Sequence, residues 1–150
     1  MGLLKRTKWL GAVAACAAVS WGSTAEAEGG WAPLRGGLTT HQVECESLCT
    51  QGVLTGPLAG QLDFTMHSMT PTAEPDVVIY VGTNVITTPT GTLSGTDYGI
   101  WNLATGEFVD YMTFTEATGS YAGKTGSFTI YGGYDPVAGV GSSQYVALLF

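Results

Sequence analysis

Basic residues are scarce in this sequence, in which five Lys and Arg stand against twelve Asp and Glu among 150 residues. Three of the five lie within the first eight positions, so only Arg35 and Lys124 remain downstream. A surface of this charge repels phosphate backbones and anionic lipid. Because no basic patch offsets that repulsion, we expect no nucleic-acid partner.

Long apolar runs are also lacking. The uncharged segment at residues 9–19 has 11 residues, whereas a membrane-spanning helix needs roughly 20. It follows a cationic patch at residues 5–8 and precedes an Ala-Glu-Ala exit at residues 25–27, which is the order of a secretory signal peptide. We therefore predict that residues 1–27 are a cleaved signal peptide, that the mature chain is periplasmic or extracellular, and that it has no stable membrane span.

One alternative for this export segment stays open. Residues 13–16, Val-Ala-Ala-Cys, resemble a bacterial lipobox, in which Cys16 is lipidated and becomes the new N-terminus. The Ala-Glu-Ala cleavage site at residues 25–27 is better formed than the lipobox, which favours cleavage before Glu28. Intact mass separates the two, because cleavage there discards Cys16 whereas lipidation retains it with added acyl mass.

Cysteine is rare as well, with three in the chain. Cys45 and Cys49 remain after signal cleavage, and disulfides persist in exported proteins, so we predict a bridge between them. The alternative is a zinc site, because His41, Cys45 and Cys49 are spaced at four and four. A fourth ligand is not evident and no metal or cofactor motif occurs, so neither a metal nor a cofactor is expected.

Residues 39–50 are the segment with a helical pattern. Thr39 is placed to cap a helix, Gln42 to complete a capping box and Gly52 to end it. The two cysteines would then share one face of that helix. The sequence predicts one short helix here, within an N-terminal arm that spans residues 28–57.

From residue 58 onward the polarity alternates with a period of two, which is typical of half-buried strands. Six strand-like segments follow one another, at residues 61–67, 77–86, 91–103, 108–114, 127–131 and 139–150. Residues 104–107 form the clearest hairpin turn. On residues 77–86, both faces of the strand look partly covered.

An antiparallel sheet with no long helix to cover it must bury its apolar sides against each other, as a barrel or a sandwich. Regularly placed glycines ease strand curvature and favour the barrel. We predict one all-β domain at 28–150, with an antiparallel β-barrel of about eight strands and calycin-like shape over 58–150. Two strands remain to be placed, either at residues 28–38 or 52–57 or at a break in a long strand.

Carboxylates on apolar strand faces are the first candidates for chemistry. Asp97 shares its face with Trp101, and Asp110 and Glu116 share theirs with three apolar side chains. Burial makes a carboxyl costly to ionise, so an inward-facing Asp97 or Glu116 would act as general acid or base, or orient a polar ligand head. The alternative places these carboxylates at the barrel rims in water.

Apolar side chains on the same strands would furnish a deformable lining for a ligand. The candidates are Phe64, Met66, Trp101, Met112 and Phe114. They are equally compatible with a plain core, because a barrel of this size is either filled or holds one small ligand. A hydrolase is not expected, because His41 and His67 are the histidines of the chain and neither lies in a nucleophile motif.

Three segments carry a family resemblance, namely residues 95–99 (Gly-Thr-Asp-Tyr-Gly), 105–108 (Thr-Gly-Glu-Phe) and 118–128 (Thr-Gly-Ser-Tyr-Ala-Gly-Lys-Thr-Gly-Ser-Phe). In order and spacing they resemble bacterial members of the allene oxide cyclase and dirigent barrel superfamily, over about residues 58–150. The resemblance implies an antiparallel barrel, usually of eight strands, whose interior holds an apolar ligand or a reactive intermediate. Cyclases of this shape act largely by confining a flexible substrate, so no catalytic residue carries over.

These observations leave three hypotheses for the function. The first is an exported barrel that binds a small, mainly apolar molecule in its interior. The second is a cyclase or isomerase of the allene oxide cyclase-like type that uses the same cavity. The third is a surface or interaction protein with a filled barrel, and the oligomeric state stays open for all three.

Overall fold

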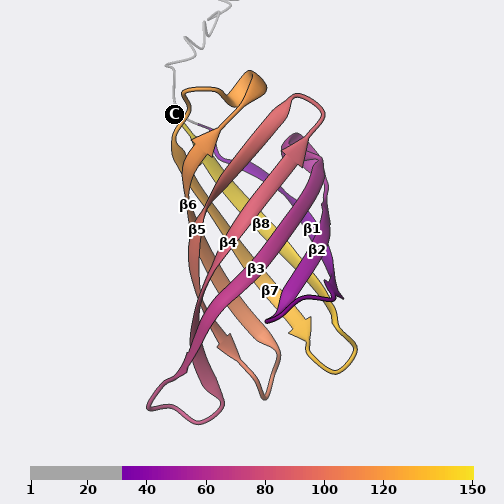
Figure 1. Ribbon diagram of the computed structural model, residues 1–150, viewed down its shortest axis with the longest axis vertical. Coiled ribbons are helices and arrows are strands. Elements are labelled where there is room, and N and C mark those ends of the chain that lie inside the picture. Colours follow the sequence, from indigo (N-terminus) through magenta and orange to yellow (C-terminus); the bar gives the residue numbers. More distant parts are fainter. Residues whose placement is uncertain (1–31) are drawn as a thin grey trace, which may run out of the picture.

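The computed structural model describes residues 32–150, which form a closed antiparallel β-barrel of eight strands (Figure 1). Each strand pairs with the next, and β8 pairs with β1 to close the sheet. The strands are β1 (Leu34–Val43), β2 (Cys49–Leu54), β3 (Gly60–Pro71), β4 (Val77–Thr88), β5 (Gly91–Asn102), β6 (Glu107–Ala117), β7 (Gly126–Asp135) and β8 (Val140–Leu149). Closure leaves no edge strand unpaired, which is how an all-β chain without a covering helix protects its sheet. The predicted signal peptide and the lipidation alternative lie outside the described residues and stay predictions.

The predicted helix over residues 39–50 is wrong. Residues up to Val43 complete β1, residues 44–48 form a connection, and β2 follows. The reason is pairing over a long distance in sequence, because β1 is held on one side by β2 and on the other by β8. A capping side chain such as Thr39 is worth only about 1 kcal/mol, whereas the strand buries Leu38 and closes the barrel.

The two strands that the sequence pattern left unplaced are β1 and β2, so the barrel begins at Leu34 and not near residue 58. Helical structure in residues 32–150 is limited to two single turns, η1 (Gly56–Leu58) and η2 (Gly119–Tyr121). No helix in this part of the chain is long and apolar enough to cross a membrane.

The barrel has two ends that differ in their connections (Figure 1). The loop end carries the β1–β2, β3–β4, β5–β6 and β7–β8 connections, and the terminal end carries η1, η2, the β4–β5 turn and the C-terminus. The predicted hairpin at residues 104–107 is the β5–β6 connection. There Gly106 has φ of 78°, and its N–H donates to the Asn102 carbonyl at 2.8 Å. This left-handed conformation favours glycine.

The half of the interior next to the terminal end, called here the terminal half, is filled by apolar side chains. Its buried members are Leu38, Leu54, Leu58, Leu62, Ile86, Leu93, Met112, Phe114, Phe128, Ile130, Tyr145 and Ala147. Leu58 enters from η1 and has no exposed surface. Its N–H donates to the Tyr145 hydroxyl at 3.2 Å, and that hydroxyl donates to the Thr55 carbonyl at 2.7 Å. These hydrogen bonds fix η1 across the terminal end of the barrel.

The outer face of the barrel carries partly exposed apolar side chains. On β4 the inward residues are buried, but Ile79 is 43% exposed and Val85 is 40% exposed. The neighbouring strands continue this apolar outer face with Tyr98, Ile100, Val109, Tyr111 and Tyr131. The inward face of β4 is thus buried, and its outward apolar side chains are covered only in part.

Candidate functional site

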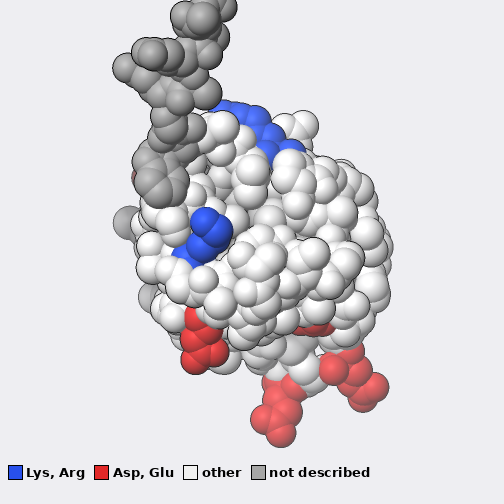
Figure 2. All heavy atoms as spheres, turned by 90° about the horizontal axis from the view of Figure 1, so that it is seen from above, with Lys and Arg blue, Asp and Glu red and all other residues white. Residues whose placement is uncertain are grey.

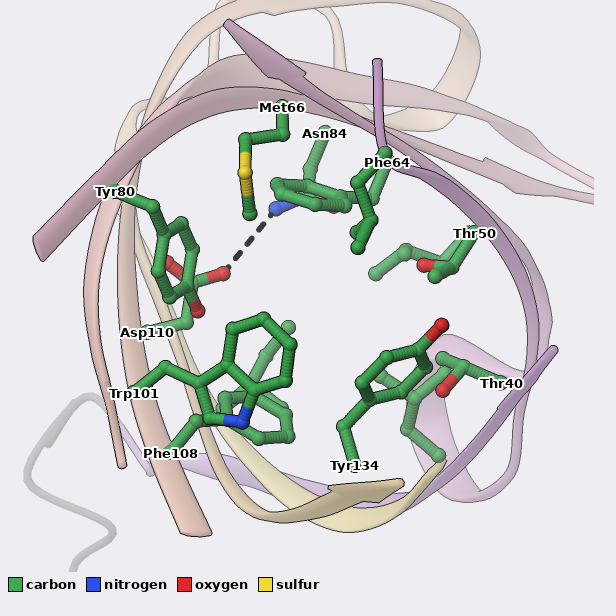
Figure 3. Close-up of a pocket in the computed structure, with 14 residues that line it drawn as sticks. Thr40, Thr50, Phe64, Met66, Tyr80, Asn84, Trp101, Phe108, Asp110 and Tyr134 are labelled. Atoms are coloured by element: carbon green, nitrogen blue, oxygen red, sulfur yellow. Dashed lines mark hydrogen bonds between the residues drawn. The ribbon is translucent and has the colours of Figure 1, made fainter. Parts of the chain in front are cut away.

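A half-open cavity of about 60 Å³ lies in the other half of the interior, called here the loop half (Figure 3). It borders the filled core at Leu38, Leu62 and Ile130, and the rest of its lining is Thr40, Leu48, Thr50, Phe64, Met66, Tyr80, Asn84, Trp101, Phe108, Asp110 and Tyr134. By volume it holds on the order of four water-sized groups. The lining is mainly apolar with a few polar atoms, which is the usual composition of a small-molecule site.

The aromatic rings of the loop half lie against the barrel wall and leave the axis open (Figure 3). The Tyr80 ring occupies the place that a side chain at position 99 would need, because a Cβ on Gly99 would lie 2.2 Å from Tyr80 Cζ. The rings of Phe64 and Tyr80 pack edge to face with their centroids 6.0 Å apart. The rings of Trp101 and Tyr134 pack in the same way with their centroids 5.6 Å apart. A strand glycine thus makes the space for one of the inward rings.

Three buried polar side chains form a cluster at this cavity, one from each of three adjacent strands, and two of them, Asn84 and Asp110, line it. Asn84 of β4 and Asp97 of β5 are 1% exposed, and Asp110 of β6 is 3% exposed. The Asn84 amide nitrogen donates to Asp97 Oδ2. It also donates to Asp110 Oδ2 at 3.4 Å (Figure 3). One amide group therefore links two buried carboxyl groups.

Burial raises the pKa of both carboxyl groups. For Asp110 the pKa rises to about 8, because the group is desolvated and also faces the charge of Asp97. The pKa of Asp97 is raised by its desolvation as well, although a side-chain hydrogen bond with Asp110 opposes the rise. Tyr80 lies nearby, and burial together with the two carboxylates raises the pKa of its phenol. Because two charged carboxylates are costly to hold together when desolvated, the pair holds a shared proton at neutral pH.

Four buried polar atoms of this region have no hydrogen-bond partner in the protein. They are Asn84 Oδ1, Asp97 Oδ1, Asp110 Oδ1 and Trp101 Nε1. Of their residues, Asn84, Asp110 and Trp101 line the cavity. A buried polar group without a partner costs about 1–3 kcal/mol. A molecule that enters the cavity and pairs with these atoms relieves that cost.

The predicted lining residues divide between the two halves of the barrel. Phe64, Met66 and Trp101 line the cavity. Met112 and Phe114 face inward as expected, but they belong to the filled core of the terminal half. The alternation of the strands predicts which side chains point inward, but it does not say at what height along the axis they lie.

The predicted catalytic candidates Asp97 and Glu116 are not brought together. Asp97 is buried beside Asp110, whereas Glu116 is exposed on the outside of β6. The reason is a β-bulge. Gly95 pairs with Phe114 but Ser94 pairs with Glu116, so Thr115 is an extra residue that reverses the alternation. The rim alternative is thus wrong for Asp97 and Asp110, which lie inside the barrel.

Sequence reasoning did not single out Asn84, Tyr80 or Tyr134 for the site. Asn84 lies on the same face of β4 as Tyr80 and Ile86, and an Asn on the apolar face of a strand was the available signal. Tyr134 approaches from the end of β7, next to the β7–β8 turn. Its place on the cavity depends on the closure of the barrel, which the local sequence does not show.

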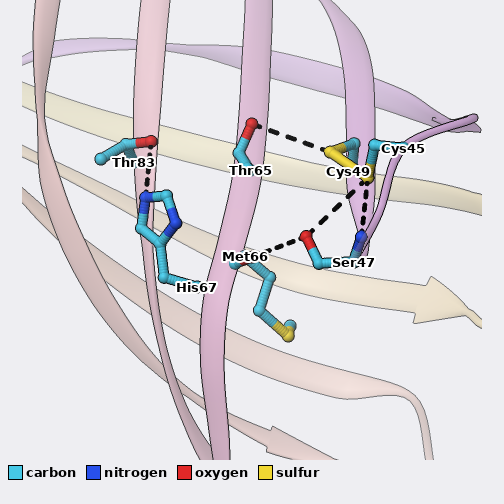
Figure 4. Close-up of a disulfide and its surroundings, with 7 residues drawn as sticks. All are labelled: Cys45, Ser47, Cys49, Thr65, Met66, His67 and Thr83. Atoms are coloured by element: carbon cyan, nitrogen blue, oxygen red, sulfur yellow. Dashed lines mark hydrogen bonds between the residues drawn. A yellow bond between two sulfur atoms is a disulfide. The ribbon is translucent and has the colours of Figure 1, made fainter.

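The Cys45–Cys49 bridge is present and lies at the loop end (Figure 4). Within the loop that it closes, the Ser47 hydroxyl donates to the Met66 carbonyl at 2.8 Å, and the Met66 N–H donates to the Leu48 carbonyl at 2.9 Å. The loop is thereby fixed to β3, with Leu48 on the cavity. Across residues 32–150, no group of three His, Cys, Asp or Glu is arranged to hold a metal ion.

Both histidines lie outside the cavity. His67 is the unpaired residue at a second bulge, between Met66 and Ser68 of β3, and it is exposed as expected. Its Nε2 lies 3.1 Å from the Thr83 hydroxyl (Figure 4). His41 is exposed on β1. Neither lines the cavity.

Charge is divided between the two ends of the barrel. Exposed carboxylates at the loop end are Glu44, Glu46, Glu74, Asp76, Glu107 and Asp135. The cations of residues 32–150, Arg35 near the start of β1 and Lys124 in the β6–β7 connection, belong to the terminal end. Figure 2 looks onto that end, with the blue atoms in view and the red atoms towards the margin. The cavity therefore lies at the negative end of the molecule.

Comparisons with known proteins do not extend this picture. No protein-family model, curated protein or solved structure matches the chain. The resemblance to the allene oxide cyclase and dirigent barrels therefore stays a prediction.

Proposed function

We propose that this protein is an exported binding protein that holds a small, mainly apolar molecule in the cavity of the loop half. The observation that carries the proposal is the set of unpartnered buried polar atoms on Asn84, Asp110 and Trp101 within an otherwise apolar, aromatic lining. A plain core would place apolar atoms there, because unpaired polar groups destabilise a packed interior. The cavity is thus arranged for a ligand with an apolar body and at least one polar group.

The size of the cavity limits the ligand. At about 60 Å³ it is much smaller than a site for a drug-sized molecule, which occupies roughly 300–1,000 Å³. A ligand of a few non-hydrogen atoms enters without rearrangement. A longer one requires movement of a flexible side chain, and Met66 is the one on the cavity wall that adapts most easily.

Thermal unfolding with a panel of small amphiphilic molecules tests this proposal. We expect members of the panel to raise the melting temperature in a saturable way, because a ligand that binds only the folded state stabilises it. The matched control is Gly99→Ala, since its new methyl group displaces the Tyr80 ring from the wall into the cavity. That variant should fold but lose the ligand-dependent rise. The proposal is contradicted if no member of the panel raises the melting temperature of the wild-type protein and a crystal structure shows no cavity.

Proton-transfer catalysis in the same cavity, as in a cyclase or isomerase, is the second candidate. The buried pair favours it, because a carboxyl group with pKa of about 8 beside a carboxylate is poised to give and take a proton near neutral pH. Asp110 is the acid or base in contact with the cavity, and Asp97 is its positioning residue. Since Glu116 is exposed, it has no part in this version. Unchanged turnover of a substrate by Asp110→Asn would exclude it.

A further inference from the structure

The charged side chains at the loop end restrict the charge of a ligand that approaches the cavity. Every connection at the loop end is flanked by an exposed carboxylate, as at Glu46, Asp76, Glu107 and Asp135. Neither cation of residues 32–150 lies at this end. A field of this sign raises the local concentration of cations and repels anions. An acid or a phosphate ester is thus disfavoured before it reaches the cavity.

The polar atoms inside the cavity favour the same sign. Two unpartnered acceptors, Asn84 Oδ1 and Asp110 Oδ1, belong to lining residues, against one unpartnered donor, Trp101 Nε1. A ligand with several N–H donors satisfies the acceptors by hydrogen bonds, a quaternary ammonium centre is attracted to them by its charge alone, and one hydroxyl or ether oxygen satisfies the indole N–H. A carboxylate ligand would place a second negative charge beside the one that the Asp97–Asp110 pair already carries.

The aromatic rings around the cavity are the third feature that favours a cationic ligand. Phe64, Tyr80, Trp101, Phe108 and Tyr134 surround the cavity (Figure 3). The negative faces of such rings attract a cation, most strongly where water is excluded, and they also pack against its methyl or methylene groups. Recognition of alkylammonium groups uses this combination of rings and carboxylates.

Resting on the proposed function, we propose that the ligand is a small organic cation, an amine or quaternary ammonium compound with a short body that carries one oxygen. The cationic centre lies against Asp110 and Asn84, between the rings of Tyr80 and Trp101. The oxygen accepts a hydrogen bond from Trp101 Nε1. Apolar contact alone does not satisfy these polar atoms, so the uncharged molecule of the same shape binds more weakly.

Binding of such a cation should release a proton from the Asp97–Asp110 pair. Because burial raises the pKa of Asp110 to about 8, the pair is partly protonated at neutral pH and must lose that proton to interact fully with a cation. The other titratable groups facing the pair are Tyr80, which burial and the carboxylates keep neutral, and His67, whose charge acts on Asp97 from outside. Affinity should therefore increase as the pH rises from about 6 to about 8.5.

Matched pairs of a cation and its uncharged isostere test the proposal on the wild-type protein. The pairs are ethanolamine with propan-1-ol, and choline with 3,3-dimethylbutan-1-ol, titrated at constant ionic strength. The readout is the indole N–H resonance of Trp101, assigned with Trp101→Phe. At about pH 8.5 we expect at least one cation to bind about tenfold or more tightly than its isostere. That preference should shrink towards about pH 6.

Two variants with the same change of charge sharpen this test. Asp110→Asn should remove most of the preference for the cation and its pH dependence, while binding of the alcohol stays unchanged. Asp63→Asn is the control, because Asp63 lies on the outer face of β3 and its carboxylate accepts hydrogen bonds from the Gln61 side-chain amide. It should leave both affinities as in the wild type.

The outcomes separate this inference from the function on which it rests. If the alcohols bind as tightly as the cations, the cavity binds ligands but the inference of a cation is overturned. A cation preference that Asp63→Asn reduces as much as Asp110→Asn overturns the inference too, because it would reflect the overall charge. If no member of either pair gives a saturable shift of Trp101, both the inference and the proposed function fail.

Discussion

The two halves of this barrel share eight strands but use their interiors differently. In the terminal half, aliphatic side chains and stacked rings fill the space, and Leu58 closes the end. In the loop half, rings lie against the wall around a cavity, and Asn84, Asp97 and Asp110 are buried without a full set of partners. The terminal half is built as a stable core, whereas the loop half keeps polar atoms that a core does not need.

This difference shows how one small barrel can combine stability and binding. A closed sheet of this size encloses only enough space to be filled or to hold one small molecule. Filling one half completely provides the apolar burial that offsets chain entropy. The other half can then tolerate unpaired polar groups, which would be too costly if they extended through the whole interior.

The largest expected difference between the halves is in the cost of removing a ring. Phe128 has no exposed surface and stacks on Tyr145 at 5.0 Å. Phe128→Ala should lower the free energy of unfolding by about 3–5 kcal/mol. Phe108→Ala should cost less than half as much, because Phe108 already borders a cavity. Urea denaturation at neutral pH measures both, and equal losses would contradict the division into a filled half and an open half.

The pH dependence of stability gives an effect of similar size. The pKa of Asp110 is about 8 in the folded protein, well above its ordinary value, so the folded state holds a proton that the unfolded state has lost. Stability should therefore fall as the pH rises between about 4 and about 8, by up to about 1.4 kcal/mol per pH unit. Asp110→Asn should flatten this slope and stabilise the protein at high pH. Denaturant unfolding across the pH range gives the slopes, and an unchanged slope in the variant would refute the assignment.

A smaller effect is expected from the disulfide at the loop end. It closes a short loop between Cys45 and Cys49, for which the chain-entropy relation gives about 2 kcal/mol. Replacing both cysteines by serine should lower stability by that amount. Hydrogen exchange should then become faster at Leu48 and its neighbours but not at η1. Uniform acceleration in both halves would show that the bridge stabilises the whole barrel and not the loop end alone.

The smallest effect is expected for Glu116, which lies outside the barrel. Glu116→Gln should change the free energy of unfolding by less than about 0.5 kcal/mol and should leave ligand binding unchanged. The bulge at Thr115 turns Glu116 outward into water, whereas Asp110 on the same strand is buried. The difference between Glu116→Gln and Asp110→Asn therefore measures the effect of burial on a carboxylate of β6. Loss of binding in this variant would place Glu116 at the site after all.

Much of the barrel was predictable from the period-two pattern. It put Asp97 on one face with Trp101, and that face points inward in the structure, while the bridge between the two cysteines was predicted from the expected export of the chain. What failed depends on interactions that are distant in sequence. The segment at residues 39–50 has local helix signals, but it pairs with β8 at the other end of the chain.

The candidate site was only partly predictable, for two physical reasons. A bulge adds one residue without a clear mark in the sequence, and this reversed the side on which Glu116 lies. The stagger of the strands sets the height of each side chain along the axis, and it puts Met112 in the filled half. It also brings Asn84 next to Asp97 and Asp110, a contact that no single strand encodes.

Titration of the buried pair distinguishes a desolvated site from one that water reaches freely. Carbon-13 NMR of the aspartate carboxyl groups, recorded across the pH range, follows each one separately. We expect Asp110 to titrate near pH 8 and Asp97 to titrate above the ordinary range for aspartate, because burial desolvates both groups. If both carboxyl groups instead titrate near their ordinary pKa of about 3.9, they are solvated and the proposed site does not exist.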